Sequence, residues 1–232
     1  MPTCLQFALS NPVAGHEDGF NCWYGSDHLI HGVLTPGVLA GQRFRRATGP
    51  WPSGKHDYLM IWEMDDPAFA LEQLASVKNT AAMPISPAID MTTVQPPTFW
   101  RRATVRSSAR IATDTARRRT VVLMLANAAE GQGDAFEAAL LRGGLAELAD
   151  LPGVIVAELL TLAEQQIRGN ARKFPYALLV ELHDEPAALA ALAPRLPALP
   201  HLDPERWLAT VFRPIGDRMT TADARRLVAE HA

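Results

Sequence analysis

The chain repeats a set of turn and core residues at an almost constant spacing. Asn11, Phe20 and Pro36-Gly37-Val38 recur 116 residues later, as Asn127, Phe136 and Pro152-Gly153-Val154. Tyr58 and Glu63 recur 118 residues later, and Pro67 recurs 119 residues later. A drift of only three residues over the whole set is hard to obtain by chance. The sequence therefore predicts two structural units of similar size.

Hydrophobic periodicity and turn residues divide the first half into six elements. We expect helices over 17–34 and 67–77, and strands over 5–10, 38–46, 57–64 and within 91–100. Asn11-Pro12 stops the first strand, and Thr35-Pro36-Gly37 ends the first helix. The order strand–helix–strand–strand–helix–strand is the ferredoxin-like motif.

The second half predicts the same order. Its expected strands are 120–126, 154–162, 176–182 and 206–214, with one helix over 135–149 and another opening at Asp184. The fold class is then α+β, with two tandem ferredoxin-like (βαββαβ) units at 1–100 and 119–217. A C-terminal tail, 218–232, is expected to be helical.

An arginine-rich connector, 101–118, separates the two units. From Arg101 to Arg119 there are seven arginines and one acidic residue, Asp114. No aromatic residues are interleaved with these charges, and neither half shows the aromatic strand motif of an RNA-binding sheet. We interpret the stretch as a solvated linker whose ends extend strands, and we expect no nucleic-acid partner.

Composition narrows the class of protein further. Hydrophobic residues make up 48% of the chain and the formal net charge is −3, too small to steer nucleic acid or an acidic membrane. Cys4 and Cys22 lack metal or disulfide spacing, which indicates free thiols. The N-terminus shows no secretory pattern and no apolar run could cross a bilayer. We therefore expect a soluble, cytoplasmic protein with no membrane partner.

Three features carry a resemblance to a known superfamily. They are the Asn11-Pro12 stop, the helix pattern Phe20-Asn21-x-Trp23-Tyr24-x-x-x-His28, and the Pro36-Gly37-Val38 turn. They resemble the dimeric α/β-barrel superfamily, and within it the EthD-like and stress-responsive barrel proteins. The resemblance covers 3–100 and 119–217, and it implies that the two units pair sheet to sheet as an intramolecular dimeric α/β-barrel.

The resemblance also implies where a ligand would bind. Members of the superfamily bind small, often aromatic or polyketide-like molecules in the cleft between sheet and helices. Their activities include cofactor-free monooxygenases, cyclases, dehydratases and isomerases, with haem enzymes in some branches. Many members have no known activity, so the resemblance constrains the fold more than the reaction.

The first expected helix carries the candidate chemistry. At α-helical spacing Phe20, Tyr24, Asp27 or His28, and His31 share one face. His28 suits proton transfer near neutral pH, so we assign it as general base or acid. Tyr24 is the expected donor to an enolate or phenolate oxygen.

Other candidates surround this face. Asn11, at the end of the first strand, could add an amide donor, and Trp23 and Trp62 could form the pocket wall. Asp27, His31 and Arg43 are expected substrate-binding residues, Arg43 for an anionic group. The second half has Ala139, Leu140 and Gly144 where the first has Trp23, Tyr24 and His28. If the fold alone required these side chains, both halves should have them, so their presence in the first half alone favours a functional role.

A metal or haem is not predicted. Four of the seven histidines lie in the first unit, but the spacing of His28 and His31 offers no fixed third metal ligand. The Asn-Trp-His set of the haem-degrading branch is not matched, since Glu72 stands ten residues past Trp62. We expect no cofactor.

The sequence thus favours a cofactor-independent enzyme that transfers a proton on a small hydrophobic, oxygenated molecule, as a dehydratase, cyclase or isomerase. The alternative is a non-catalytic small-molecule-binding or stress-responsive protein of the same fold, in which Tyr24 and His28 only pack between elements. A haem- or metal-dependent oxygenase is a third reading. A homodimer through outer surfaces stays open.

Overall fold

The computed structural model describes residues 4–81, 83–108, 119–167 and 173–230, and both halves have the predicted order of elements. The first half comprises β1 (Cys4–Ser10), α1 (Glu17–Trp23), a π-helical turn (Tyr24–His28), α2 (Leu29–Leu34), β2 (Val38–Ala47), β3 (Tyr58–Met64), α3 (Pro67–Val77) and β4 (Thr98–Arg106). The second comprises β5 (Thr120–Ala128), α4 (Gly133–Ala139), a π-helical turn (Leu140–Gly144), α5 (Leu145–Ala149), β6 (Val154–Leu162), β7 (Tyr176–Leu182), α6 (Glu185–Leu192) and β8 (Leu202–Pro214). A short strand, β9 (Met219–Thr220), and a last helix, α7 (Thr221–Glu230), follow.

The strands close into one barrel. Their order is β3-β1-β4-β6-β7-β5-β8-β2, and β2 pairs back onto β3, so eight strands form a closed ring. Four strands come from each half, and the halves join through two antiparallel seams, β4 with β6 and β2 with β8. The predicted pairing of two ferredoxin-like units within one chain is confirmed.

Alternation along each strand separates the barrel interior from its outer surface. In β1, Leu5, Phe7 and Leu9 belong to the interior cluster, whereas Cys4 and Ala8 pack on the outer, helix-covered side. The interior is filled at its middle by four fully buried phenylalanines, Phe7, Phe44, Phe99 and Phe212. Space inside the barrel is therefore limited to its two ends.

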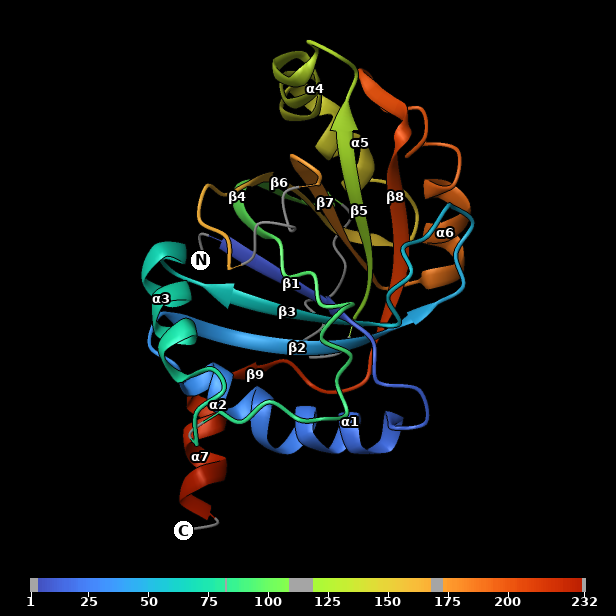
Figure 1. The fold of residues 1–232 in the computed structure, drawn as a ribbon. Coiled ribbons are helices and arrows are strands. Elements are labelled where there is room, and N and C mark those ends of the chain that lie inside the picture. Colours follow the sequence, from blue (N-terminus) through green and yellow to red (C-terminus); the bar gives the residue numbers. More distant parts are fainter. Residues whose placement is uncertain (1–3, 82, 109–118, 168–172, 231–232) are drawn as a thin grey trace.

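Helices cover the outside in two groups (Figure 1). The α1–α2 helix runs beneath β2 and β3, with α3 at one edge, while α4, α5 and α6 cover the second half. The outer α7 packs against α2, and β9 pairs with β2. Among the described residues, no helix has both the length and the apolar character needed to span a membrane.

The repeated Pro-Gly-Val turns have a steric cause. Gly37 and Gly153 adopt φ values of +86° and +79°, a region that disfavours side chains. A Cβ on Gly153 would lie 2.3 Å from the carbonyl oxygen of Asp184, and a Cβ on Gly37 would lie 3.1 Å from the Ala70 Cα. Each turn thus touches the helix that begins after the next two strands, α3 for Gly37 and α6 for Gly153, and only glycine allows this contact.

The start of the connector belongs to a strand. We placed the connector at 101–118 and expected its ends to extend strands, and β4 continues through Arg106. The reason is Glu158 of β6, which pairs with Arg101 at 3.0 Å and accepts a hydrogen bond from Thr104 at 2.9 Å. Residues 109–118 of the connector lie outside the described residues. The predicted helical tail contains α7, preceded by the two residues of β9.

Comparing two glycines of the second half tests this account of the turns. Gly131 also has a positive φ, +70°, but a Cβ there would meet nothing within 4 Å. Gly131→Ala should lower the free energy of unfolding by about 1–2 kcal/mol, the cost of the backbone conformation. Gly153→Ala should lower it by roughly 2 kcal/mol more, because the start of α6 must move. Urea unfolding measures both, and equal losses would contradict the steric argument.

Candidate functional site

The first helix changes its winding where the candidate residues lie. Between α1 and α2 the backbone forms one π turn, in which the Leu29 N–H donates to the Tyr24 carbonyl five residues earlier. Such turns are frequent at functional sites. The second half, however, has a π turn at the equivalent place, Leu140–Gly144. The turn therefore belongs to the repeated frame, and its side chains distinguish the first half.

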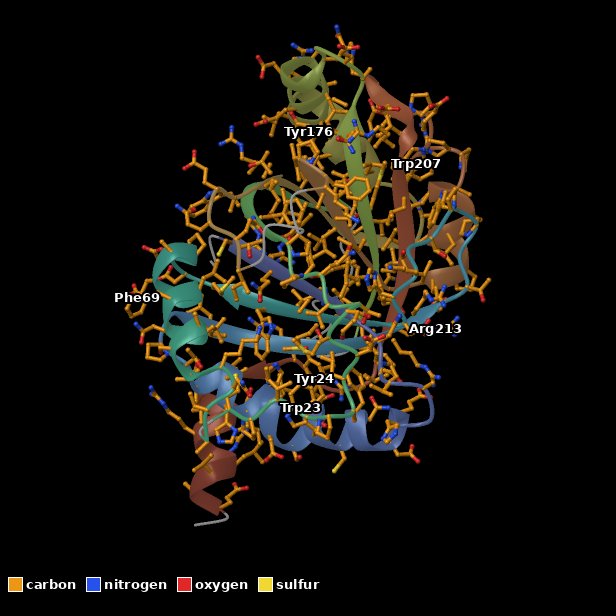
Figure 2. All side chains as sticks on the ribbon, in the orientation of Figure 1. Trp23, Tyr24, Phe69, Tyr176, Trp207 and Arg213 are labelled. Atoms are coloured by element: carbon orange, nitrogen blue, oxygen red, sulfur yellow. The ribbon has the colours of Figure 1, made fainter. Side chains whose placement is uncertain are left out.

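His28 lies in an aromatic cage formed by Trp23, Tyr24 and Trp62. Its ring stacks on Trp23 with centroids 4.5 Å apart and an interplanar angle of 29°. Tyr24 meets the imidazole edge-on at 4.8 Å, and Trp62 does so at 6.0 Å. Figure 2 shows Trp23 and Tyr24 in the space between the helix and the sheet. The Trp23 indole donates to the Pro84 carbonyl at 2.9 Å, which fixes this wall of the cage.

The Trp62 ring occupies space that glycine leaves free. A Cβ on Gly32 would lie 2.2 Å from Trp62, and a Cβ on Gly41 would lie 2.9 Å from the same ring. The strand register makes Val180 the counterpart of Trp62 in the second half, and the repeat spacing places Leu148 where Gly32 stands. In the first half the small residue is on the helix and the large one on the strand, whereas in the second half the helix carries leucine and the strand carries the smaller valine. In the first half the strand supplies the large aromatic side chain.

The cage borders a cavity of about 80 Å³ between the outer face of β1 and β3 and the helices. Its other polar residues are Gln6, Ser10 and Lys78, and its remaining lining is apolar. Two buried atoms on this lining, His28 Nδ1 and Ser10 Oγ, have no hydrogen-bond partner among the described residues. A buried polar atom without a partner is destabilising by about 1–3 kcal/mol. The pair therefore marks the cavity as a place for a polar ligand group.

Burial sets the charge of the candidate base. Removal from water, together with smaller effects of the charges of Lys78, Arg43 and His31, lowers the pKa of His28 from 6.5 to about 4. The imidazole is neutral at physiological pH and suited to accept a proton. Burial also raises the pKa of Tyr24 to about 12, against the lowering effect of Arg43. Tyr24 therefore keeps its phenolic proton and can donate it.

The structure does not bring Asn11 to this cavity. The Asn11 Oδ1 accepts from the Asp57 N–H at 2.6 Å, and its Nδ2 donates to the Lys55 carbonyl at 3.1 Å. Asn127 makes the same kind of contact, donating to the Arg206 carbonyl at 3.2 Å. Asn11 holds a loop in place, and both of its amide atoms are engaged. Asn11 does not line the cavity beside His28, and its role as a donor to substrate stays a prediction.

Arg43, Asp27 and His31 also lie away from the cavity lining. Arg43 donates to the backbone and side-chain oxygens of Asn21 at 3.2 and 2.8 Å, and its guanidinium stands 4.6 Å from the Tyr24 ring centroid. It fastens the helix to β2 instead of facing the ligand space. Asp27 and His31 are exposed, and His31 Nδ1 hydrogen-bonds with the Asp27 carbonyl at 2.9 Å. Of the predicted residues, the structure groups His28, Tyr24, Trp23 and Trp62.

Sequence reasoning missed Ser10, Gln6 and Lys78. The signal for the first two was present in β1, because polar Gln6 and Ser10 alternate with apolar Leu5, Phe7 and Leu9. Period-two alternation places the polar pair on the helix-covered face. Lys78 sits at the C-terminal end of α3, and no sequence pattern indicated that this end reaches His28.

The donor set does not fit a metal or haem. The described residues contain no group of three or more His, Cys, Asp or Glu side chains that could hold a metal ion. A haem held by His28 would have to enter the cavity beside it, and about 80 Å³ is well below the roughly 300 Å³ at which sites for drug-sized ligands begin.

The lowered pKa of His28 predicts a pH-dependent stability. The unfolded chain binds the proton near pH 6.5 and the folded chain only near pH 4, so the free energy of unfolding falls as pH is lowered through this window. The loss reaches about 3 kcal/mol and levels off below pH 4. His28→Phe keeps an aromatic ring but lacks the titration. Urea unfolding of both proteins from pH 7 to 4 measures the difference, and a constant difference would contradict the burial of the imidazole.

The sequence matches no protein-family model and no curated protein. Solved structures do match. An anthrone oxidase-like protein aligns with a TM-score of 0.65 and 12% identity over 96% of this chain and 94% of that chain. A candidate monooxygenase from Fusobacterium nucleatum gives 0.63 and 9% over 94% of each chain. Chlorite dismutase from Candidatus Nitrospira defluvii gives 0.55 and 10% over 90% of each chain.

Sequence identities of 9–12% show only that the folds are similar. The narrower likeness to EthD-like and stress-responsive proteins stays a prediction. Both the closed ring of strands and these neighbours agree on the architecture. The chain has the α+β fold of the ferredoxin-like dimeric α/β-barrel proteins.

Proposed function

We propose that the protein is a cofactor-independent enzyme that binds a small hydrophobic, oxygenated molecule beside His28 and transfers a proton. The observation that carries the proposal is the pair of unpartnered atoms, His28 Nδ1 and Ser10 Oγ, on one small, mainly apolar cavity. An apolar cavity with a few fixed polar groups is the usual form of a small-molecule site. The ligand supplies the hydrogen-bond partners that these two atoms do not find among the described residues.

His28 acts as the general base. In the tautomer with its hydrogen on Nε2, the neutral ring presents the Nδ1 lone pair to a carbon or hydroxyl acid. Proton transfer places an imidazolium beside an enolate or phenolate. Attraction between these opposite charges in a buried site offsets the desolvation that lowers the pKa of the free protein. The base is weak before the ligand binds and stronger once the anion forms.

Two further residues stabilise the anion. The charge of Lys78 acts on His28 strongly enough to lower its pKa, so it also attracts a negative oxygen in the same cavity. The Tyr24 hydroxyl, protonated because its pKa is about 12, donates to that oxygen. Trp23 and Trp62 bind the flat, apolar body of the ligand.

Such an anion leads to several reactions. It can expel a leaving group, attack an internal carbonyl or take up a proton elsewhere, which are the first steps of a dehydratase, cyclase or isomerase. One structural neighbour is described as anthrone oxidase-like, and an aromatic ketone of that class is itself a carbon acid. We therefore assign enolisable aromatic ketones and phenols as the substrate class. The reacting end enters the cavity, and the rest of a larger ligand extends through its opening.

Proton transfer can be tested before the natural substrate is known. In D₂O under argon, the protein should speed exchange of the acidic C–H of an enolisable ketone, followed by ¹H NMR. The ketones range from one ring, acetophenone, to three rings, anthrone. His28→Phe should lower the exchange rate by roughly 10²–10⁴-fold, because the base is gone and the ring shape is kept.

Two variants control this experiment. His31→Phe alters an exposed histidine on the same helix and should leave the exchange rate unchanged. Ser10→Ala removes a donor but not the base, so it should slow exchange by about tenfold. If several ketones bind equally to wild type and His28→Phe and none exchanges faster than in buffer, the cavity is a binding site without turnover.

A further inference from the structure

The barrel has a second hollow, inside the ring of strands and beneath the β2–β3 loop. It measures about 260 Å³ and lies on the far side of the sheet from His28. Inward-facing residues form its wall, chiefly Leu9, Leu123, Leu125, Leu208 and Phe212. Figure 1 shows the β2–β3 loop beside β8, to which it is fastened by hydrogen bonds from Ala209 to the Pro52 carbonyl and from Gly54 to Thr210 Oγ1.

The rim of this hollow is cationic. Lys55, His56 and Lys173 line it, and none of the described residues that line it is acidic. The neighbouring carboxylate in the chain, Asp57, is held by Arg46. Asp90 lies near enough to feel the charge of Lys55, but it accepts hydrogen bonds from Thr92 and does not line the hollow. Neither lysine forms an ion pair among the described residues.

The opposite end of the barrel is arranged differently. There the carboxylates of Glu63, Glu158 and Glu181 pair with Arg218, Arg101 and Arg119. Those charges compensate each other within the protein. The chain has 19 arginines and only three lysines, and two of the three lysines line this hollow without an ion pair to a carboxylate in the part of the chain that the structure describes.

His56 adds a polar group between the two lysines. Its Nε2 donates to the Thr93 carbonyl at 2.9 Å, which leaves Nδ1 as an acceptor. A Cβ on Gly54 would lie 3.9 Å from this Nδ1, and both residues line the hollow. Burial and the charges of Lys55 and Lys173 lower the pKa of His56, whereas its hydrogen bond to Thr93 and the charge of Asp57 raise it. Both lysines therefore stand close to the same imidazole.

We propose that this end of the barrel binds a monocarboxylate with an apolar body. The carboxylate lies at Lys55 and Lys173, and the hydrocarbon part lies against Leu125 and Phe212. Charge complementarity selects a carboxylate, because two lysines stand at the rim of a mainly apolar wall whose other polar residues, His56, Gln95 and Thr210, carry no negative charge. A volume of about 260 Å³ holds roughly nine groups of about 30 Å³, the volume of one water. A chain of octanoate length fits this space.

Isothermal titration calorimetry with octanoate and 1-octanol tests the proposal. The two probes have the same chain and differ in charge. Wild type should bind octanoate roughly tenfold more tightly than octanol, and Lys55→Ala/Lys173→Ala should lose that preference. Both lysines are exposed, so the double variant should keep the melting temperature of the wild type. Gly54→Leu should abolish binding of both probes, because its Cβ meets only ordinary contacts and the side chain extends into the hollow.

Lys78→Ala is the matched control, because Lys78 lines the His28 cavity instead. It should leave octanoate affinity unchanged. The proposal is overturned if wild type fails to bind octanoate at millimolar concentration, or if the double variant binds it as tightly as wild type. It is equally overturned if Lys78→Ala alone removes binding, since the carboxylate would then occupy the other cavity. None of these outcomes depends on proton transfer at His28.

Discussion

Closure of the sheet by the β4–β6 and β2–β8 seams is the constraint on which the rest of the structure depends. In a closed ring every strand residue faces either the interior or the helices, because side chains alternate. The same strand, β1, therefore supplies Leu9 to one cavity and Ser10 to the other. Four phenylalanines fill the middle of the ring. In the part of the chain that the structure describes, the cavities discussed above lie at the barrel ends and beneath the helices.

The two halves share this frame but differ in where they place volume. Both helices have the π turn, and both Pro-Gly-Val turns have a glycine at positive φ. In the second half Leu140, Leu148 and Val180 are all buried in one cluster. In the first half glycine replaces the helix leucine and Trp62 fills part of the space. What remains beside His28 is a cavity with two unpartnered polar atoms.

The frame was predictable because it depends on local signals that occur twice. The glycine at positive φ in the Pro-Gly-Val turn and an Asn that binds loop backbone each occur in both halves, 116 residues apart. The candidate site was harder to predict, because its residues were chosen at α-helical spacing. The π turn inserts a residue, which rotates everything after it by about 100° relative to an ideal α-helix. His31 is turned to solvent for this reason, whereas Tyr24 and His28, both within the turn, stay together.

The remaining misses concern contacts between segments distant in the chain. Asn11 looked free at the end of a strand, yet the Asp57 N–H that it binds is 46 residues away. Lys78 reaches His28 only because α3 ends beside the cage. The segment Met91–Gln95 also joins distant parts of the structure. Met91 and Val94 line the His28 cavity, and Gln95 lines the second hollow, at Lys55 and Lys173. The Thr93 carbonyl between them accepts the hydrogen bond of His56, so one short segment forms a wall of both cavities. Such sharing follows from three-dimensional closure and leaves no pattern in a single sequence.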